Sequence, residues 1–230
     1  MKTKEPNHYL KLAIHQPNFI PRLKVLQKLA NADVWCVLDS VQYCVREWQS
    51  RTRIIPMHGD SKPFWLSIPV KRPKGRSSLI NEIMIENPTS TSIMIEKTLF
   101  HAFHHSPYWS TIQEFITSAK DNILKSNLTR LCVETTNALL SIAKKKPTLI
   151  YSSSLPIEGK ASTLIASICR YLEYENYLTD SGSRNYMLPD HFKGINVLWQ
   201  NWHEPFEKDT GNSSWRNAGS INFLSRYGPE

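Results

Sequence analysis

The chain has 230 residues, of which 40% are hydrophobic and 21% charged, so it is long enough to bury a substantial core and has an ordinary globular composition. Its formal net charge of +8 and isoelectric point near 9.3 favour anionic partners. No apolar run reaches the roughly 18 residues that a membrane helix needs, and the first ten residues lack a signal peptide's apolar region. These features predict a cytoplasmic protein without membrane insertion.

The first third of the chain predicts two parallel strands joined by a helix. Apolar runs at residues 12–14 and 34–38 flank a helical pattern at 22–32, and such a connection folds as a right-handed crossover. Polar residues follow both strands: His15, Gln16, Pro17 and Asn18 after the first, and Asp39, Gln42, Arg46, Trp48, Gln49 and Arg51 after the second. Ligands lie outside the carboxyl ends of parallel strands, so we expect the two polar clusters to lie side by side.

The middle of the chain changes character twice. Residues 51–55 and 64–70, separated by a turn, predict a hairpin, and alternation over 79–85 predicts a further strand beside it. Residues 92–145 contain only helical patterns and no glycine, which indicates a helical insert that serves as a lid or subdomain. His101, His104 and His105 lie in this insert without a third ligand at a fixed spacing, so structural or surface histidines are favoured over a metal site.

The α/β alternation then resumes to the end of the chain. Strands are predicted near 149–152, 175–178 and 195–200, with helices at 161–172 and 220–227. The fold class is therefore α/β: a mostly parallel sheet flanked by helices, with a β-hairpin extension and a helical insert. The expected segments are an N-terminal half at 1–91, the insert at 92–146 and a C-terminal half at 147–230 that completes the same sheet in one domain.

Two later segments suit an anionic ligand. Gly159 and Lys160 precede a helix start with hydroxyl side chains, which indicates either anion binding or ordinary helix capping; the full P-loop pattern is absent. After the next strand, Gly182 between two serines lets backbone amides approach a ligand, and Arg184 offers a bidentate grip on a carboxylate or phosphate.

The four cysteines form no C-x-x-C pair. Cys36, Cys132 and Cys169 lie among apolar neighbours and are predicted to be buried small hydrophobes. Cys44 lies in a polar segment two residues before Arg46, which leaves a nucleophilic role open.

Several short motifs resemble the WbqC-like family of bacterial proteins. They are H-Q-P-N-F-x-P, A-D-V-x-x-x-L-D-x-V-Q-Y and W-Q-x-R-x-R in the first third, and Gly159-Lys160, Tyr177-Leu178, the segment 181–186, Gly194-Ile195 and Ser220-Ile221 later. The resemblance implies a role in making surface polysaccharides or natural products. Arg22, where an aromatic residue is common in the family, and the atypical segment W-R-N-A-G-S-I depart from its pattern, so substrate choice could differ.

The strand-exit residues together predict a catalytic site. His15 is the expected general base, because its unperturbed pKa lies nearest neutrality, with Asp39 orienting it and Gln42 or backbone amides holding a developing oxyanion. The expected substrate-binding residues are Asn18, Arg51, Lys160, Ser181, Gly182, Arg184 and Tyr186, and no metal is expected. In the alternative reading, His15 bonds a backbone carbonyl and Asp39 caps a turn.

The sequence lacks a G-x-S-x-G elbow, a metalloprotease helix and a dinucleotide fingerprint. We therefore expect acyl or aminoacyl transfer to an amine, with no tightly bound cofactor, an acyl thioester as donor and an acidic acyl carrier protein as partner. Aminoacyl-tRNA stays a less favoured alternative partner, because no nucleic-acid-binding motif is present. The alternatives are an ATP-dependent nucleotidyltransferase or ligase, with ATP as co-substrate, and a non-catalytic binding module in a biosynthetic complex.

Overall fold

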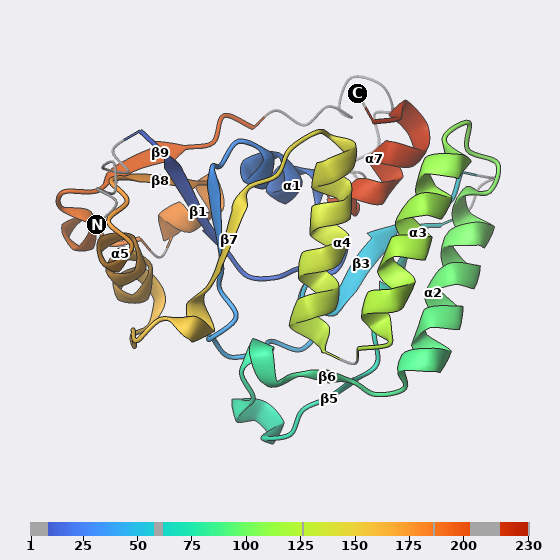
Figure 1. Cartoon of the computed structure of the whole chain (residues 1–230), viewed down its shortest axis with the longest axis horizontal. Coiled ribbons are helices and arrows are strands. Elements are labelled where there is room, and N and C mark those ends of the chain that lie inside the picture. The colour runs from blue at the N-terminus through green and yellow to red at the C-terminus, as the bar shows by residue number, and fades with distance from the viewer. Residues whose placement is uncertain (1–8, 58–61, 126, 186, 203–216, 230) are drawn as a thin grey trace, which may run out of the picture. The chain divides into compact units, whose positions relative to one another are not determined.

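The computed structural model describes residues 9–57, 62–125, 127–185, 187–202 and 217–229, and Figure 1 shows their course. The chain forms two compact units. Unit 1 consists of the described residues of Met1–Gln16, Gln27–Leu38 and Lys146–His203, and unit 2 of those of Pro17–Leu26, Asp39–Lys145 and Glu204–Glu230. The three segments predicted from the sequence, with boundaries at 91 and 146, stay a prediction.

Unit 1 contains a five-stranded parallel sheet (Figure 1). Its strands in spatial order are β7 (Thr148–Tyr151), β2 (Val34–Val37), β1 (Lys11–His15), β8 (Asn176–Thr179) and β9 (Asn196–Trp199). The helices that connect them include α1 (Leu23–Ala30) and α5 (Ala161–Tyr171). The boundary between the two units falls within α1, after Leu26. All four residues of β2 are buried, as expected for a strand inside a parallel sheet that is covered on both faces. The predicted α/β class and the parallel pairing of the first two strands are confirmed.

The order of the strands reverses between β1 and β8. From β1 the chain adds β2 and then β7 on one side, and afterwards it adds β8 and β9 on the other side of β1. In doubly wound sheets such a reversal opens a crevice outside the carboxyl ends of the two strands, where ligands bind. The end of β1 and the beginning of the segment after β8 are therefore the first places to look for a site in unit 1.

Unit 2 combines two small antiparallel ribbons with helices. The hairpin pairs β3 (Arg51–Ile54) with β4 (Phe64–Ser67), and a second ribbon pairs β5 (Val70–Lys71) with β6 (Met84–Ile85). The helices are α2 (Pro88–Phe103), α3 (Trp109–Ile123), α4 (Leu128–Ile142) and α7 (Ser220–Tyr227). Short 3₁₀ turns complete the described elements of both units: Gly75–Ser77, Ile80–Glu82, Ser152–Ser154, Ser181–Asn185 and Pro189–Phe192.

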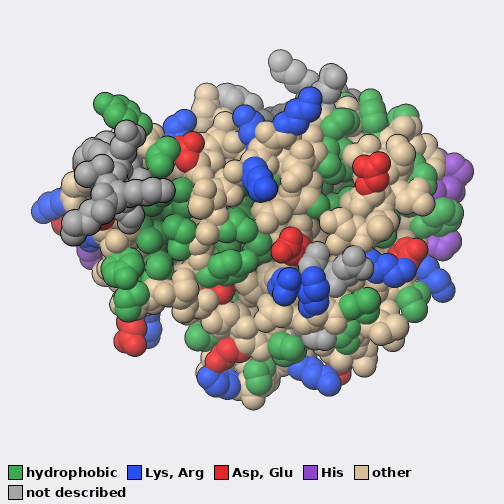
Figure 2. Space-filling model, viewed as in Figure 1, with side chains coloured by type: hydrophobic (Ala, Val, Ile, Leu, Met, Phe, Trp, Pro, Cys, Tyr) green, Lys and Arg blue, Asp and Glu red, His purple; other side chains and the backbone are tan. Residues whose placement is uncertain are grey.

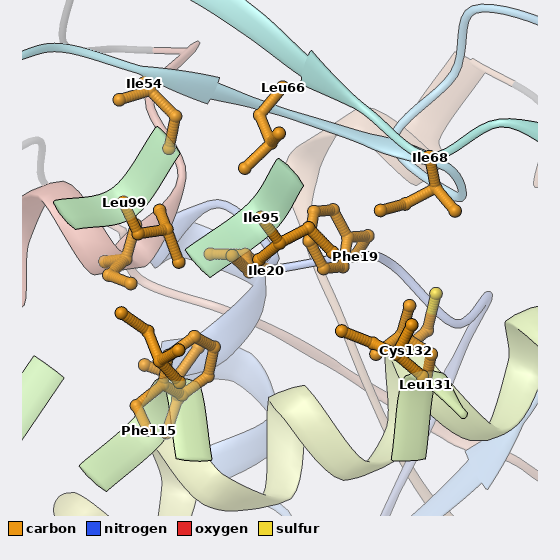
Figure 3. Close-up of a cluster of buried hydrophobic side chains, with 14 of the residues drawn as sticks. Phe19, Ile20, Ile54, Leu66, Ile68, Ile95, Leu99, Phe115, Leu131 and Cys132 are labelled. Carbon is orange, nitrogen blue, oxygen red and sulfur yellow. The ribbon is translucent and has the colours of Figure 1, made fainter. Parts of the chain in front are cut away.

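One hydrophobic core joins the hairpin of unit 2 to its helices. Figure 3 shows Ile54 and Leu66 of the hairpin facing Ile95 and Leu99 of α2, with Phe19 and Ile20 among them. Ile54 and Leu99 are fully buried. The helical structure predicted for residues 92–145 is confirmed by α2, α3 and α4, which share this core with the hairpin.

The strand predicted at 79–85 is wrong over most of its length. Ile80–Glu82 forms a 3₁₀ turn, Leu79 makes an isolated bridge with Gln42, and only Met84–Ile85 forms a strand, paired with Val70–Lys71. The Glu82 carboxylate accepts a hydrogen bond from the Leu79 amide at 2.9 Å, which favours the turn, while Ile80 and Ile83 still reach the core. Apolar residues do alternate in this segment, but the hydrogen bond between the Leu79 amide and the Glu82 carboxylate favours a turn over an extended strand. None of the described helices combines the length and apolar character needed to cross a bilayer.

Candidate functional site

His15 and Asp180 lie on the same face of the unit 1 sheet, at its carboxyl edge. In the parallel pairing of β1 with β8, Ala13 lies opposite Leu178. Paired residues of neighbouring strands share a face, and side chains two positions further along point to that face again. The strand exits at the switch point therefore bring a histidine and an aspartate together.

Lys28 of α1 connects these two side chains. Its Nζ lies 3.1 Å from Nδ1 of His15 and 3.3 Å from Oδ2 of Asp180, and the lysine side chain is only 2% exposed. Side chains of a helix tilt toward its N-terminus, and the N-terminus of α1 follows the carboxyl end of β1. A lysine in the last turn of α1 can thus reach back to the strand exits.

Other polar contacts fix the surroundings of this trio. The His15 carbonyl accepts hydrogen bonds from Nε1 of Trp35 at 3.2 Å and from the Leu38 amide at 2.9 Å, so the backbone at the end of β1 is held in place. The Gln200 side chain, after β9, donates to the Gln27 side chain of α1 at 2.5 Å. We call His15, Lys28 and Asp180 the switch-point cluster.

The charge state of Lys28 determines what His15 can do. A lysine ammonium has three donors and no acceptor, so Nδ1 of His15 must accept from it and the proton of the neutral ring lies on Nε2. In that state Nε2–H is a donor. If the pair loses one proton, Lys28 is neutral, Nδ1–H can donate to it, and Nε2 becomes an acceptor and a base. The two states give the same imidazole opposite chemical roles.

Arg184 lies at the same edge of the sheet and stacks over the ring of Trp199 at 4.5 Å. Trp199 pairs with Thr179, so it faces away from the side of the sheet that carries Asp180. Stacking uses one face of the guanidinium group, and the N–H groups at its edges are the ones that bind a carboxylate or phosphate.

The amides expected to approach a ligand after β8 are partly used within the chain. The Gly182 amide donates to Oδ1 of Asp180 at 2.9 Å, and the Ser183 amide donates to the Asp180 carbonyl at 3.0 Å. Ser181 and Gly182 are exposed, whereas the Ser183 hydroxyl is buried against that of Thr179 at 2.7 Å. Asp180 therefore organises this turn as well as pairing with Lys28.

Lys160 precedes α5 and is exposed. The hydroxyls near it have partners: Ser162 accepts from the Leu188 amide at 3.0 Å, and Thr163 donates to the Lys160 carbonyl at 2.6 Å. These hydrogen bonds tie the hydroxyls to other parts of the chain, while Lys160, the N-cap residue of α5, makes no side-chain capping hydrogen bond, so both readings of this helix start stay predictions. Lys160 itself forms no ion pair within the described part of the chain.

Four predicted site residues belong to unit 2. Asp39 is 2% exposed, and its carbonyl accepts from the Asn81 amide. Asn18 is buried as well, Gln42 donates to the Arg76 carbonyl at 2.6 Å, and Arg51 stacks over Trp65 at 4.0 Å. The carboxylate joined to His15 through Lys28 is Asp180, so the pairing of His15 with Asp39 and the oxyanion role of Gln42 stay predictions. Tyr186 lies outside the described residues.

Sequence reasoning missed Lys28 and gave Asp180 no role. A signal for Lys28 was present, because it lies three residues after Val25 and next to Leu29, on the apolar stripe of its helix. A charge on a buried stripe needs a partner. Asp180 is the first residue after its strand, the position that had drawn attention to His15.

Burial separates the four cysteines as predicted. Cys36, Cys132 and Cys169 are buried and Cys44 is exposed, all as free thiols. Burial raises the pKa of Cys132, and burial together with the neighbouring Cys36 raises the pKa of Cys169 to about 12. The thiol of Cys44 lies 3.9 Å from the Gln42 carbonyl. A nucleophilic role for Cys44 stays a prediction.

Histidine side chains gather at the α2 edge of unit 2 (Figure 2). His101 and His104 pack against Phe100, and His105 packs against His104. The Phe100 and His104 rings are stacked with centroids 4.7 Å apart. Among the residues that the structure describes, no group of three or more His, Cys, Asp or Glu side chains is placed to hold a metal ion. Aromatic packing accounts for the arrangement of these rings.

Comparison with known proteins identifies a family and a relative, and neither name states an activity. The family described as "WbqC-like protein family" matches residues 16–221. The "Uncharacterized protein Rv1507c" of Mycobacterium tuberculosis is 24% identical over 192 residues, which cover 82% of this chain and 81% of the relative. No solved structure shows a significant match.

Proposed function

Since the chain belongs to the WbqC-like protein family, we propose that it is a group-transfer enzyme that moves an acyl or aminoacyl group onto an amine, at the switch-point cluster of unit 1. The acceptor is an amino sugar or an amino-acid-derived metabolite in surface-polysaccharide or natural-product biosynthesis, as the family resemblance suggests. The expected cytoplasmic location belongs to the same proposal.

The burial of Lys28 between His15 and Asp180 carries this proposal. Removing a lysine ammonium from water is unfavourable unless partners compensate, and a hydrophobic residue on this helix stripe would fill the space without that cost. Interacting titratable groups at a ligand-binding edge are typical of catalytic sites. The cluster lies at the crevice that the strand order predicts.

The chemistry follows from the deprotonated state of the pair. The amine nitrogen attacks the acyl carbonyl carbon of a thioester or ester, and a C–N bond forms. Nε2 of His15 takes the proton that the amine loses, and Nδ1–H is held by Lys28. The bond from the acyl carbon to sulfur or oxygen then breaks, and the leaving group receives the proton from Nε2. Arg184 binds an anionic part of the donor or acceptor.

The strand order favours one second candidate, an ATP-dependent nucleotidyltransferase or ligase. The order in unit 1, with a reversal beside the first strand, is the arrangement in which doubly wound sheets bind nucleotides. Here the protonated pair would act: the Lys28 charge and the Nε2–H of His15 stabilise negative charge that develops on a phosphoryl group. The two candidates thus need opposite protonation states of the same pair.

A pH-dependent assay of the purified protein separates them. Acyl and aminoacyl thioesters are supplied with a panel of amines and thiol release is followed, while ATP is supplied in parallel and pyrophosphate release is followed. Acyl transfer predicts thiol release that increases with pH as the pair loses its proton, and ATP use predicts pyrophosphate release that decreases.

Lys28→Met and His15→Gln are the test variants, and Lys193→Met is the matched control, because Lys193 is an exposed lysine of the same unit. Both test variants should lose at least about 100-fold in rate, the lower range for general acid–base catalysis, while the control retains it. A thermal-shift screen against the same ligands accompanies the assay, since a ligand at about 100 Kd stabilises by about 2.7 kcal/mol. If a ligand binds but is not turned over, and His15→Gln leaves its binding unchanged, the protein is a non-catalytic binding module.

A further inference from the structure

One face of the unit 2 hairpin carries arginine and tryptophan side chains. In the antiparallel register, Arg51 lies opposite Ser67 and Arg53 opposite Trp65, so these four residues share a face. The alternating residues Thr52, Ile54 and Leu66 are buried and form the other face. One face of the hairpin thus packs on the core, and the other face carries cationic and aromatic side chains.

Trp48 and Arg22 extend this face. Trp48 packs edge-on against Trp65 with ring centroids 5.2 Å apart, and Arg22 lies over Trp48 at 5.2 Å. Arg51 lies over Trp65 at 4.0 Å. In the order Arg22, Trp48, Trp65, Arg51, two guanidinium groups flank a pair of indole rings that meet edge-on. We call these four residues, together with Arg53, the hairpin face.

The hairpin face is open and carries unbalanced positive charge. Trp65 is 42% exposed although Arg51 covers part of its ring. Within the described part of the chain, no carboxylate forms an ion pair with Arg22, Arg51 or Arg53. The only side-chain hydrogen bond described for these arginines joins Arg22 to Asn217 at 3.5 Å, and Nε of Arg51 is buried without a partner there.

We propose that the hairpin face binds single-stranded nucleic acid. Sites of this kind combine cations that follow the phosphate backbone with aromatic rings on which bases stack, and arginine contributes to both. The sequence lacks the motifs of the common nucleic-acid-binding modules, but the fold brings the required cations and aromatics together on one strand pair. The proposal concerns unit 2 alone and does not depend on the reaction proposed for unit 1.

Positive charge alone favours anionic ligands, but it does not distinguish single-stranded nucleic acid from other polyanions. An acidic peptide or a sulfated polysaccharide offers carboxylates or sulfates to the arginines but no planar rings for exposed Trp65. A duplex offers phosphates but keeps its bases stacked inside. Preference for single strands over duplexes and over other polyanions is therefore the property that the tryptophans should confer.

The test is fluorescence anisotropy of the full chain with a labelled single-stranded RNA of about 12 nucleotides, within the site sizes of single-strand binders. The same sequence as single-stranded DNA, the RNA duplex and heparin are the comparison ligands. Trp65→Ala should weaken single-strand binding about 10-fold or more, and Trp65→Phe should restore most of it. Phe100→Ala, an exposed aromatic of the same unit that packs against Trp109, should bind as the wild type does.

Salt dependence tests the arginines. Arg53→Gln should bind more weakly and reduce the slope of log K against log salt by about 0.7, the value for one phosphate contact to a single strand. Lys97→Met, which removes an exposed charge from α2, should leave the slope unchanged. Equal binding by Trp65→Ala and wild type, equal affinity for heparin or duplex, or no binding to either single strand would each overturn the proposal. Circular dichroism of each variant confirms that the fold is retained.

Discussion

Lys28 and Asp180 form an ion pair of 3.3 Å in which the lysine side chain is 2% exposed and the aspartate 18%. Because the lysine is buried, removal of Asp180 takes a charged partner away from an ammonium group that is largely shielded from water. We expect Asp180→Ala to lower the free energy of unfolding by about 3 kcal/mol. Lys28→Met removes the buried charge itself and should cost clearly less. Urea unfolding of both variants measures the difference, and equal losses would show that the pair is not electrostatically coupled.

Asn222 ties the C-terminal helix α7 to the hairpin. Its side chain accepts from the Ile55 amide at 2.7 Å and donates to the carbonyls of Arg53 at 2.9 Å and Gly219 at 2.7 Å, and the residue is fully buried. Asn222→Ala leaves these backbone groups without their partner, so we expect a loss of about 1–3 kcal/mol in unfolding free energy. Denaturant unfolding checks this, with exposed Asn201→Ala as the control that should change little.

The cysteines should differ sharply in reactivity. Cys44 is exposed, whereas burial raises the pKa of Cys132 and Cys169 and so disfavours their reactive thiolates. With a colorimetric disulfide reagent at neutral pH, one of the four thiols should react rapidly in the native protein, and all four should react after unfolding. Cys44→Ser should remove the rapid phase. Rapid reaction of a second thiol would contradict the burial of the other three.

Glu82 should give the protein an acid-sensitive contribution to stability. Hydrogen bonds from Lys74 and from the Leu79 amide hold the pKa of Glu82 below its ordinary value of 4.5. A carboxylate with a lowered pKa in the folded state stabilises the protein above its unfolded pKa, and that contribution is lost as pH falls through the folded pKa. The stability difference between wild type and Glu82→Gln should therefore be present at neutral pH and disappear well below pH 4.5. Glu86→Gln, at an exposed position nearby in the chain, is the control for replacing a surface carboxylate by an amide.

The sequence by itself determined the class of the fold and the family. Apolar runs at the strands and the 3.6-residue periodicity of the helices are local signals, so they predicted the parallel sheet, the hairpin and the helices of residues 92–145. The position of His15 at a strand exit was readable for the same reason. The turn at Ile80–Glu82 was not, because a bond between the Glu82 side chain and the Leu79 amide outweighed the apolar alternation.

Only the tertiary structure decided which residues meet. Lys28, His15 and Asp180 are far apart in the chain, and the register of β1 with β8 and the reach of a buried lysine bring them together. The same holds for the hairpin face: the antiparallel pairing of β3 with β4 puts Arg51 and Trp65 on one face, and Trp48 and Arg22, from outside the hairpin, pack onto it. Strand order and register depend on long-range pairing, which a local pattern of residues does not specify. The sequence therefore predicted a site at the carboxyl edge of the sheet, and the tertiary structure showed which side chains lie together there.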